Sequence, residues 1–236
     1  MTNAKQVITR LKSLANSEIA DQSQRFFKTG KGEYGEGDIF LGIRVPTIRA
    51  EVKRMKDISI DETIKILTSK YHEARLFALI MLVEKFTKAN EPERTEIYRH
   101  YLDNLPQINN WDLVDSSAPY IIGVYLTDKD KSPIYQMADS DNLWQRRIAI
   151  MSTFTFIRQN DFKDALAIAT TLVNDNEDLI QKAVGWMLRE IGKRSLKTEE
   201  RFLQKHYKSM PRTMLRYAIE KMPERKRKAY LNGSVR

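Results

Sequence analysis

The chain has 236 residues and carries 40 Lys and Arg against 31 Asp and Glu, a net charge of +9. The absence of cysteine excludes a disulfide framework, a thiolate zinc site and a cysteine nucleophile. The first residues form no apolar signal-peptide core, and no apolar run reaches the roughly 18 residues of a membrane span. We therefore expect a soluble cytoplasmic protein that makes no membrane contact.

In chain order, almost every segment is expected to be helical, within a single domain over residues 1–236. The clearest helical periodicity of apolar residues occurs over 72–86, 144–157 and 178–191. Four prolines stand where a first helical turn can begin, since a missing N–H is harmless there: Pro46, Pro92, Pro133 and Pro211. The candidate N-caps are Asp61, Ser140 and Asp141.

Residues 30–42 interrupt this pattern, because they hold five of the nine glycines. No Gly-Lys-Ser/Thr follows at the Walker spacing, and the strand–turn–helix context of a dinucleotide fingerprint is missing. We expect either a flexible loop or a loop that folds over a ligand or against DNA. The run at 39–45 is the one candidate strand, with an extended loop as the alternative.

The helical segments recur at a nearly constant interval. Their apolar anchors, at spacings of 35, 36, 35 and 34 residues, are Ala78, Leu113, Ala149, Val184 and Ala218. Helix pairs that repeat every ~35 to 45 residues are typical of HEAT and armadillo proteins. The sequence therefore predicts an all-α superhelix, a solenoid of HEAT-like helix-pair repeats with a concave basic groove.

Positions two residues before and after each anchor point away from the buried face of their helix, so we expect them to line the groove. These pairs are Leu76 and Ile80, Trp111 and Asp115, Arg147 and Met151, Lys182 and Trp186, and Arg216 and Glu220. The set contains two of the three tryptophans, which a purely solvated face rarely carries.

The positive charge is concentrated at the C-terminal end. Residues 193–236 contain 14 Lys and Arg against four acids, a net +10, so residues 1–192 sum to −1. The excess covers several expected helices, which favours a polyanion-binding surface over a merely solvated end. The ERKRK cluster at 224–228 is either a DNA contact or a disordered tail.

Trp111 and Asp115 are four residues apart and therefore share one helix face. An exposed indole attracts a cation or stacks on a base, and a neighbouring carboxylate stabilises positive charge. Such a pair suits a target that is polyanionic overall and locally cationic, such as DNA with an alkylated purine. Asp115 is then placed to stabilise an oxocarbenium-like sugar and to position a water molecule.

Each of these residues also has a purely structural interpretation. Trp111 alone is explained by packing, Asp115 by a solvated acid, and Trp186, which follows Gly185, by close helix packing. Their joint arrangement is what favours function. The sequence predicts no metal site and no cofactor, because the three histidines are scattered, at His72, His100 and His206.

Four stretches of the chain are similar to one known family. They are FLGIRVP (40–46), NWDLVDSSAP (110–119), SDNLWQRRIAI (140–150) and IQKAVGWMLREIGK (180–193). On these motifs the chain resembles the bacterial DNA alkylation repair family of AlkD type, the HEAT-like-repeat alkylpurine DNA glycosylases. The resemblance implies a solenoid that holds alkylated duplex DNA and excises cationic N3- and N7-alkylated purines without a metal ion. We expect a monomer in the bacterial cytosol.

By motif, the resemblance implies that Trp111 and Trp186 lie beside the damaged nucleotide and that Asp115 is the catalytic carboxylate. Arg147 matches the groove arginine that contacts the DNA backbone near the lesion. The further positions expected to bind DNA are Lys182, Arg189, Lys193 and Phe26.

Two features depart from the family pattern. Phe26 or Phe27 stands where the best-known member has a Tyr near the lesion, and the loop at 30–38 is longer. Because the family includes branches without glycosylase activity, the alternative is a non-catalytic HEAT-like protein that recognises distorted or branched DNA. A third hypothesis is a protein-interaction scaffold without DNA affinity. Release of a methylated base separates the first hypothesis from the second, and DNA binding separates the second from the third.

Overall fold

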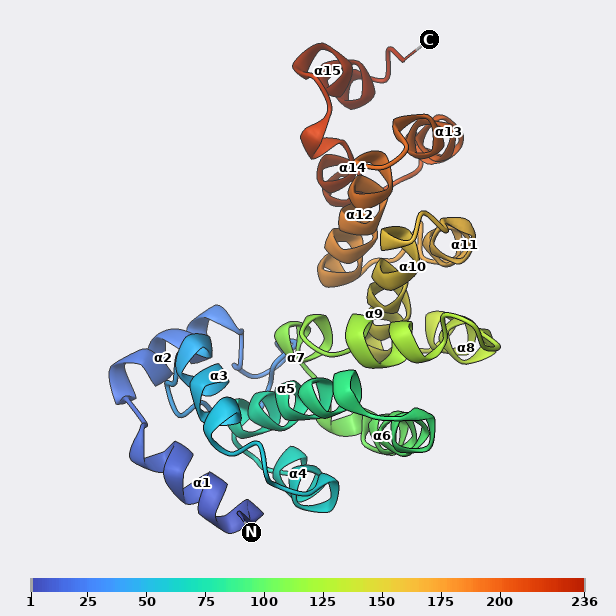
Figure 1. Cartoon of the computed structure of the whole chain (residues 1–236). Coiled ribbons are helices and arrows are strands. Elements are labelled where there is room, and N and C mark those ends of the chain that lie inside the picture. The colour runs from blue at the N-terminus through green and yellow to red at the C-terminus, as the bar shows by residue number, and fades with distance from the viewer. Residues whose placement is uncertain (1, 236) are drawn as a thin grey trace. The chain divides into compact units, whose positions relative to one another are not determined.

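The computed structural model describes residues 2–235, and its regular elements are helices, apart from one isolated β-bridge (Figure 1). The all-α prediction is confirmed. The chain packs as two compact units, Met1–Ser117 and Ala118–Arg236, which are described in turn. A single domain over residues 1–236 stays a prediction. Within the described range, no helix is long and apolar enough to cross a bilayer.

In the first unit, one central helix organises the packing. The helices are α1 (Ala4–Ser13), α2 (Ser17–Phe26), α3 (Val45–Arg54), α4 (Ile60–Leu67), α5 (His72–Lys88), α6 (Glu91–Asp103) and α7 (Trp111–Asp115), with a 3₁₀ turn at Leu105–Gln107. The central helix α5 packs against α1, α3, α4, α6 and α7, and 12 of its 17 residues are buried. A helix that is apolar on nearly all sides is buried in the core of its protein. The first turn of α5 is therefore held in place by the core of the first unit.

The second unit repeats one arrangement of helix pairs. Its helices are α8 (Ser132–Ala138), α9 (Leu143–Ser152), α10 (Phe154–Arg158), α11 (Lys163–Thr171), α12 (Asp178–Gly192), α13 (Leu196–His206), α14 (Arg212–Ala218) and α15 (Glu224–Asn232), with a π-helical turn at Pro119–Gly123 and a 3₁₀ turn at Ile219–Lys221. Helices α9, α12 and α14 pack on one another in succession, as Figure 1 shows. Helix α8 packs on α9, and both α11 and α13 pack on α12.

The predicted anchors are all buried, whereas the HEAT-like character of the repeat stays a prediction. Each anchor lies in a different helix, in α5, α7, α9, α12 and α14, and each is at most 1% exposed: Ala78, Leu113, Ala149, Val184 and Ala218. Stacked helix pairs whose inner helices contact their neighbours are the arrangement of an α-solenoid. The concave basic groove stays a prediction.

The expected outward stripe is wrong at four of its ten positions. Leu76, Ile80, Arg147 and Met151 are each at most 5% exposed. A helix has an outward stripe only where it buries a single face, whereas α5 and α9 are each packed by several neighbours and bury nearly every face. The remaining stripe positions are half-buried or exposed: Trp111, Asp115, Lys182, Trp186, Arg216 and Glu220.

The helix starts follow the prolines but not the predicted caps. Prolines occupy the second position of α3, α6 and α8 and the N-cap of α14: Pro46, Pro92, Pro133 and Pro211. Ser59 caps α4, and Asp61 instead lies in the first turn, where the helix dipole favours its charge. Asn142 caps α9 in place of Ser140 or Asp141, because its side chain accepts two first-turn N–H groups.

Residues 39–44 form an extended segment and not a strand, and Val45 already begins α3. Within the extended segment, Ile39 makes an isolated β-bridge with Tyr71. The backbone N–H groups of residues 41–43 donate to the buried carboxylate of Glu73, at 2.8, 2.7 and 3.1 Å. A side-chain carboxylate therefore takes the place of a neighbouring strand, and the extended-loop alternative is confirmed.

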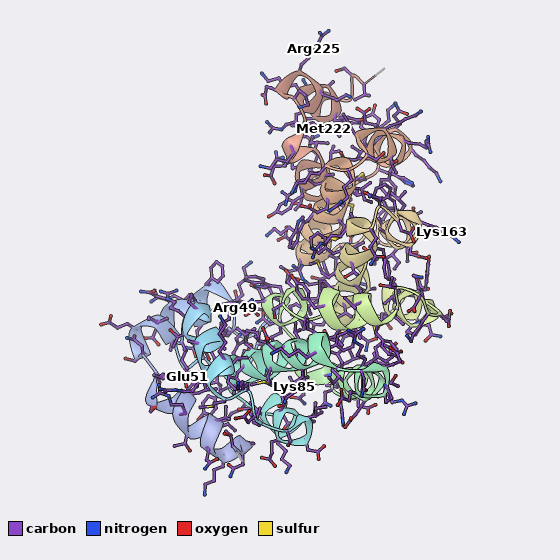
Figure 2. The ribbon with its side chains drawn as sticks, viewed as in Figure 1. Arg49, Glu51, Lys85, Lys163, Met222 and Arg225 are labelled. Carbon is purple, nitrogen blue, oxygen red and sulfur yellow. The ribbon has the colours of Figure 1, made fainter. Side chains whose placement is uncertain are left out.

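The basic end of the chain, residues 193–236, runs through α13, α14 and α15. Each of its described Lys and Arg residues is exposed or half-buried, and Arg225 extends away from α15 in Figure 2. The cluster at 224–228 is helical, because it forms the first turns of α15. The disordered-tail alternative for this cluster is therefore wrong, and its DNA contact stays a prediction.

Candidate functional site

Helix α7 holds two of the residues expected to carry chemistry, Trp111 at its first position and Asp115 at its last. Asn110 is the N-cap of α7, and its buried Oδ1 accepts the N–H of Trp111 at 2.8 Å. Leu113 and Val114 bury the opposite side of the helix. Trp111 and Asp115 are both half-buried and stand about one turn apart, as their spacing predicted.

An aromatic cluster surrounds the indole of Trp111. The ring of Phe27 stacks on it, with centroids 5.1 Å apart and planes 12° apart. The ring of Phe26 meets the indole edge-on at 6.0 Å and is 66% exposed. Phe26 is thus the solvent-facing member of the Phe26–Phe27 pair, and its correspondence to a Tyr of the family stays a prediction. Phe26 and Trp111 together present aromatic surface to solvent.

The carboxylate of Asp115 lies near a buried phenol. Tyr101 of α6 is fully buried, and its hydroxyl is 3.0 Å from Oγ of Ser117. Burial raises the pKa of Tyr101, and the charge of Asp115 raises it further. Tyr101 therefore stays protonated as a neutral neighbour of Asp115.

In the second unit, α12 gathers four of the predicted residues on one face. Lys182, Trp186, Arg189 and Lys193 follow one another at intervals of four, three and four residues, which is the spacing of a single helix face. All four side chains reach solvent in part. We call this set the α12 face.

Each side chain of the α12 face contacts an acid. Nε1 of Trp186 donates to Oε1 of Glu190 at 3.0 Å, and Nζ of Lys193 lies 2.6 Å from the same oxygen. The other ion pairs are Lys182 with Asp178 and Arg189 with Glu220. A phosphate that binds here must displace these acids, which is feasible because ion pairs at the surface contribute only about 0–1 kcal/mol.

Gly185 allows α12 to approach α14 closely. A Cβ at this position would lie 2.5 Å from the carbonyl oxygen of Met214 and 2.5 Å from Cβ of Tyr217. The close-packing interpretation is therefore confirmed for the glycine. It does not account for Trp186, whose ring stays half-buried with its centroid 6.2 Å from that of Phe154.

Arg147 is only 5% exposed, and its Nη1 donates to the carbonyl oxygen of Leu179 at 2.5 Å. Its neighbour Arg146 pairs with Asp175 at 2.7 Å. In this arrangement the Arg147 guanidinium braces α9 against the start of α12. Its contact with a DNA backbone stays a prediction, and it requires the side chain to leave this position.

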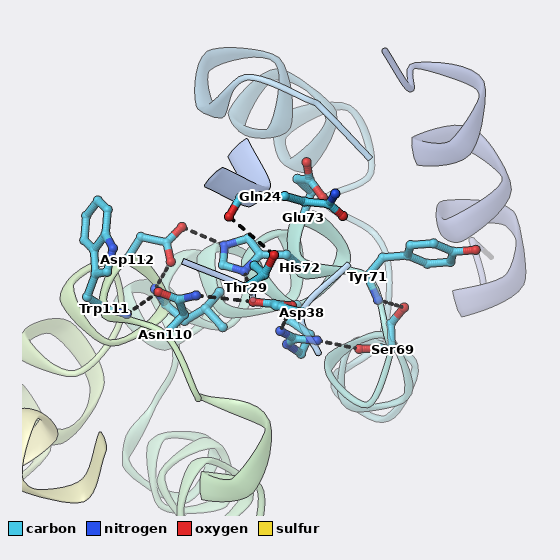
Figure 3. A network of polar contacts seen from close by, with 12 residues as sticks. Gln24, Thr29, Asp38, Ser69, Tyr71, His72, Glu73, Asn110, Trp111 and Asp112 are labelled. Carbon is cyan, nitrogen blue, oxygen red and sulfur yellow. Dashed lines mark hydrogen bonds and ion pairs between the residues drawn. The ribbon is translucent and has the colours of Figure 1, made fainter. Parts of the chain in front are cut away.

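Two of the histidines belong to clusters that sequence spacing did not reveal. His72 lies between two carboxylates in the first unit (Figure 3), and both come from other elements. The second cluster, whose donor atoms lie within 4.8 Å of one another, is Asp61, Glu96 and His100. Its members are exposed or half-buried, and exposed acids commonly gather in this way without an ion. The absence of a metal site stays a prediction.

A family model described as DNA alkylation repair enzyme matches residues 7–222. Among solved structures, the chain is similar to one described as a predicted DNA alkylation repair enzyme from Enterococcus faecalis, with a TM-score of 0.68 and 17% sequence identity. The similarity covers 89% of this chain and 97% of that chain. At this identity the structural likeness concerns the fold alone. No curated protein matches the chain in sequence.

Proposed function

This chain belongs to the DNA alkylation repair enzyme family, and we propose that it is a glycosylase that releases positively charged N3- and N7-alkylated purines from duplex DNA. The family supports a role in DNA repair. The observation that supports glycosylase activity is α7, which presents the indole of Trp111 and the carboxylate of Asp115 about one turn apart at the surface.

The aromatic cluster supplies attraction for a charged base. An alkylated purine of this class carries a positive charge, and an aromatic face within about 6 Å of a cation contributes roughly 0.5–2 kcal/mol. Phe26, which is exposed beside Trp111, adds apolar surface on which a base or sugar can rest. An undamaged purine lacks the charge and gains only the stacking.

Asp115 supplies the negative charge that bond cleavage requires. When the glycosidic C–N bond breaks, its electron pair goes to the purine, which leaves as a neutral base, and positive charge develops on the sugar. The carboxylate stabilises this sugar cation and accepts a proton from the water molecule whose oxygen bonds to C1′. The products are the free alkylpurine and an abasic sugar. The base leaves without an added proton because its alkyl group has already made it cationic.

The second unit contributes contacts to the DNA backbone in this proposal. Its α12 face carries three cations beside Trp186, and the basic end adds exposed Lys and Arg through α13 to α15. Phosphate contacts of this kind position a protein on DNA without reading its sequence, and they weaken as salt rises.

The experiment is release of 7-methylguanine from methylated duplex DNA, with protein in excess over substrate. We expect Asp115→Asn to lower the rate by about 10²–10³-fold, because the amide keeps the shape of the side chain and removes its charge. Affinity for unmodified duplex should remain. Asp103→Asn, which changes an exposed acid in the preceding helix, is the matched control and should keep the wild-type rate.

Two outcomes would contradict this proposal in different ways. A wild-type rate in Asp115→Asn removes this carboxylate from the mechanism. Binding of duplex DNA by the wild-type chain without any base release supports the non-catalytic DNA-binding alternative instead.

A further inference from the structure

A buried histidine lies between two carboxylates in the first unit (Figure 3). His72, the first residue of α5, is 1% exposed; its Nδ1 is 2.7 Å from Oδ2 of Asp38, and its Nε2 is 2.8 Å from Oδ2 of Asp112. An ionised carboxylate accepts hydrogen bonds and cannot donate them, so both ring nitrogens must carry a proton. Burial opposes this charge, but the two carboxylates raise the pKa of His72 to about 9.

The charges of this cluster balance one another. Nη2 of Arg75 donates to Oδ1 of Asp38 at 2.5 Å, so two cations face two carboxylates. Burial tends to raise the pKa of Asp38, but His72 and Arg75 hold it below its ordinary value. Oδ1 of Asp112 accepts the N–H of Leu113 at 2.9 Å, and both oxygens of this carboxylate are therefore engaged within the fold.

The same turn of α5 holds the end of the glycine-rich loop. Asp38 is bound by both cations of the turn, and Glu73 accepts the three N–H groups of residues 41–43. Gly42 has a φ of 80°, and a Cβ there would lie 2.0 Å from the carbonyl oxygen of Asn16, so the backbone passes α2 where only glycine fits. The loop is therefore anchored from Asp38 onward.

Two connections lead from His72 to Trp111. The polar one passes through Asn110, whose Nδ2 donates to Oδ2 of Asp38 at 3.3 Å and whose Oδ1 accepts the N–H of Trp111. The other is a column of stacked rings, with successive centroids 5.1, 4.9 and 4.3 Å apart, formed by Trp111, Phe27, Phe40 and His72. The loop, the end of α2 and the start of α7 are all joined at the imidazolium.

We propose that His72 is a positioning residue, which as an imidazolium locks the glycine-rich loop against α7 and thereby fixes the indole of Trp111 for base recognition. The link to base recognition rests on the proposed function, whereas the locking of the loop and the indole does not. Stability alone does not call for such a cluster, since well-packed apolar residues of similar volume often replace buried ion pairs without loss. Its directional bonds select one arrangement of loop and helix.

A pH dependence follows from the charge on the ring. The pKa of His72 rises from 6.5 to about 9 on folding, so its contribution is fully present below pH 6.5 and is lost as the pH rises through 9. The charged groups that contact the ring are Asp38 from the loop and Asp112 from α7; Arg75 of α5 pairs with Asp38, and Glu73 of α5 accepts the backbone N–H groups of residues 41–43. Loss of one ring proton leaves one carboxylate without its donor, and the loop separates from α7 there.

The experiment follows Trp111 by ¹⁹F NMR in the full chain labelled with 5-fluorotryptophan, with the signal assigned by Trp111→Phe. We expect the wild-type Trp111 signal to stay constant up to about pH 8 and then to shift and broaden with a midpoint near pH 9. In His72→Gln, whose side chain cannot carry the charge, the signal should be displaced already at pH 7 and should show no midpoint. His100→Gln, the matched histidine control on the same unit, should titrate as wild type does.

Several results would overturn the locking role. One is a wild-type Trp111 signal that shows no transition between pH 8 and pH 10, and this measurement does not depend on whether His72→Gln folds. Another is a His72→Gln signal equal to that of the wild type. Asp112→Asn keeps the histidine and removes one of its carboxylates, so the midpoint should move to lower pH, and an unmoved midpoint contradicts the proposal.

These measurements need neither DNA nor activity, so failure of the proposed glycosylase activity leaves them intact. Where base release is observed, His72→Gln should lower its rate by about tenfold to a hundredfold, because a small displacement of a recognising group has effects of that size. Affinity for unmodified duplex should not change. An unchanged rate of base release in a variant whose indole is displaced overturns the link to base recognition and leaves the locking role standing.

Discussion

The two units bury ionisable side chains in different ways. In the first unit, His72 has a carboxylate at each ring nitrogen, and every charge of the cluster faces an opposite one. In the second unit, Glu199 is 2% exposed, and its Oε1 has no hydrogen-bond partner among the described residues. Burial and the neighbouring Glu200 raise the pKa of Glu199 to about 8. We call the first the satisfied cluster because its charges are paired, although Nε of Arg75 has no hydrogen-bond partner within residues 2–235, and the second is a lone buried acid.

The two kinds of buried group have different consequences, because the cluster fixes the geometry of its neighbours and the lone acid changes only the local charge. A satisfied cluster with directional bonds holds its neighbours in one arrangement, which suits the side of the protein that carries Trp111. A lone buried acid holds nothing in place, but near pH 7 it is mostly protonated and so subtracts little from the positive charge of residues 193–236. We infer that the first unit supplies the shape that recognises a base, and the second supplies attraction for phosphates.

Breaking the satisfied cluster should have the largest effect. Arg75→Met removes one of its two cations and leaves Asp38 undercompensated in the core. Loss of one partner from a buried ion pair costs about 3–5 kcal/mol of unfolding free energy, which urea denaturation followed by circular dichroism measures. The matched change at the surface of the second unit is Arg227→Met, which breaks a pair with Glu224 and should cost no more than about 1 kcal/mol. Equal losses in the two variants would break the comparison.

The lone acid should give an effect of opposite sign. The pKa of Glu199 is raised from 4.5 to about 8 on folding, so stability falls as the pH rises from 4.5 towards 8. Glu199→Gln keeps the size of the side chain and cannot ionise. At pH 8 we expect the free energy of unfolding of this variant to exceed that of wild type by about 1–3 kcal/mol. Near pH 4 the two free energies should be equal. Parallel stability curves for the two proteins between pH 4 and pH 8 would show that this acid titrates normally.

The smallest effect should come from the exposed cations. Replacing the four consecutive cations at 225–228 by Ala should weaken binding of unmodified duplex about tenfold, or roughly 1.4 kcal/mol. The slope of log affinity against log salt should flatten by about 0.9 for each phosphate contact that is lost. The control removes four lysines from the first unit, at Lys53, Lys56, Lys85 and Lys88. If the control flattens the slope as much, charge is not the particular contribution of the second unit.

Local pattern was enough to predict much of the fold. The anchors at intervals of about 35 residues are buried in successive helices, because a 3.6-residue period can be read within each segment. The same period placed Trp111 and Asp115 on one helix, and the prolines marked the true helix starts. Local pattern failed for the outward stripe at Arg147, because the neighbours that bury this residue come from other segments.

The candidate site was only partly visible in the sequence. The spacing of the histidines from one another gives no sign of the partners of His72, which are carboxylates 34 and 40 residues away in the chain. The glycine-rich loop suggested flexibility, since nothing local showed that the carboxylate of Glu73 would take up its N–H groups. The sequence does contain one signal at His72: this polar residue and the acid Glu73 open a largely apolar helix.

The helical pairs, the uneven charge and the family can be recognised from the amino-acid sequence, because periodicity, composition and motifs are properties of short stretches of chain. Which of these side chains are buried, and which charges meet, is known only from the folded chain. Burial and pairing depend on segments that are distant in sequence and adjacent in the fold. The imidazolium of His72 is therefore a product of packing, and Trp111 takes its position from a loop that the sequence showed only as rich in glycine.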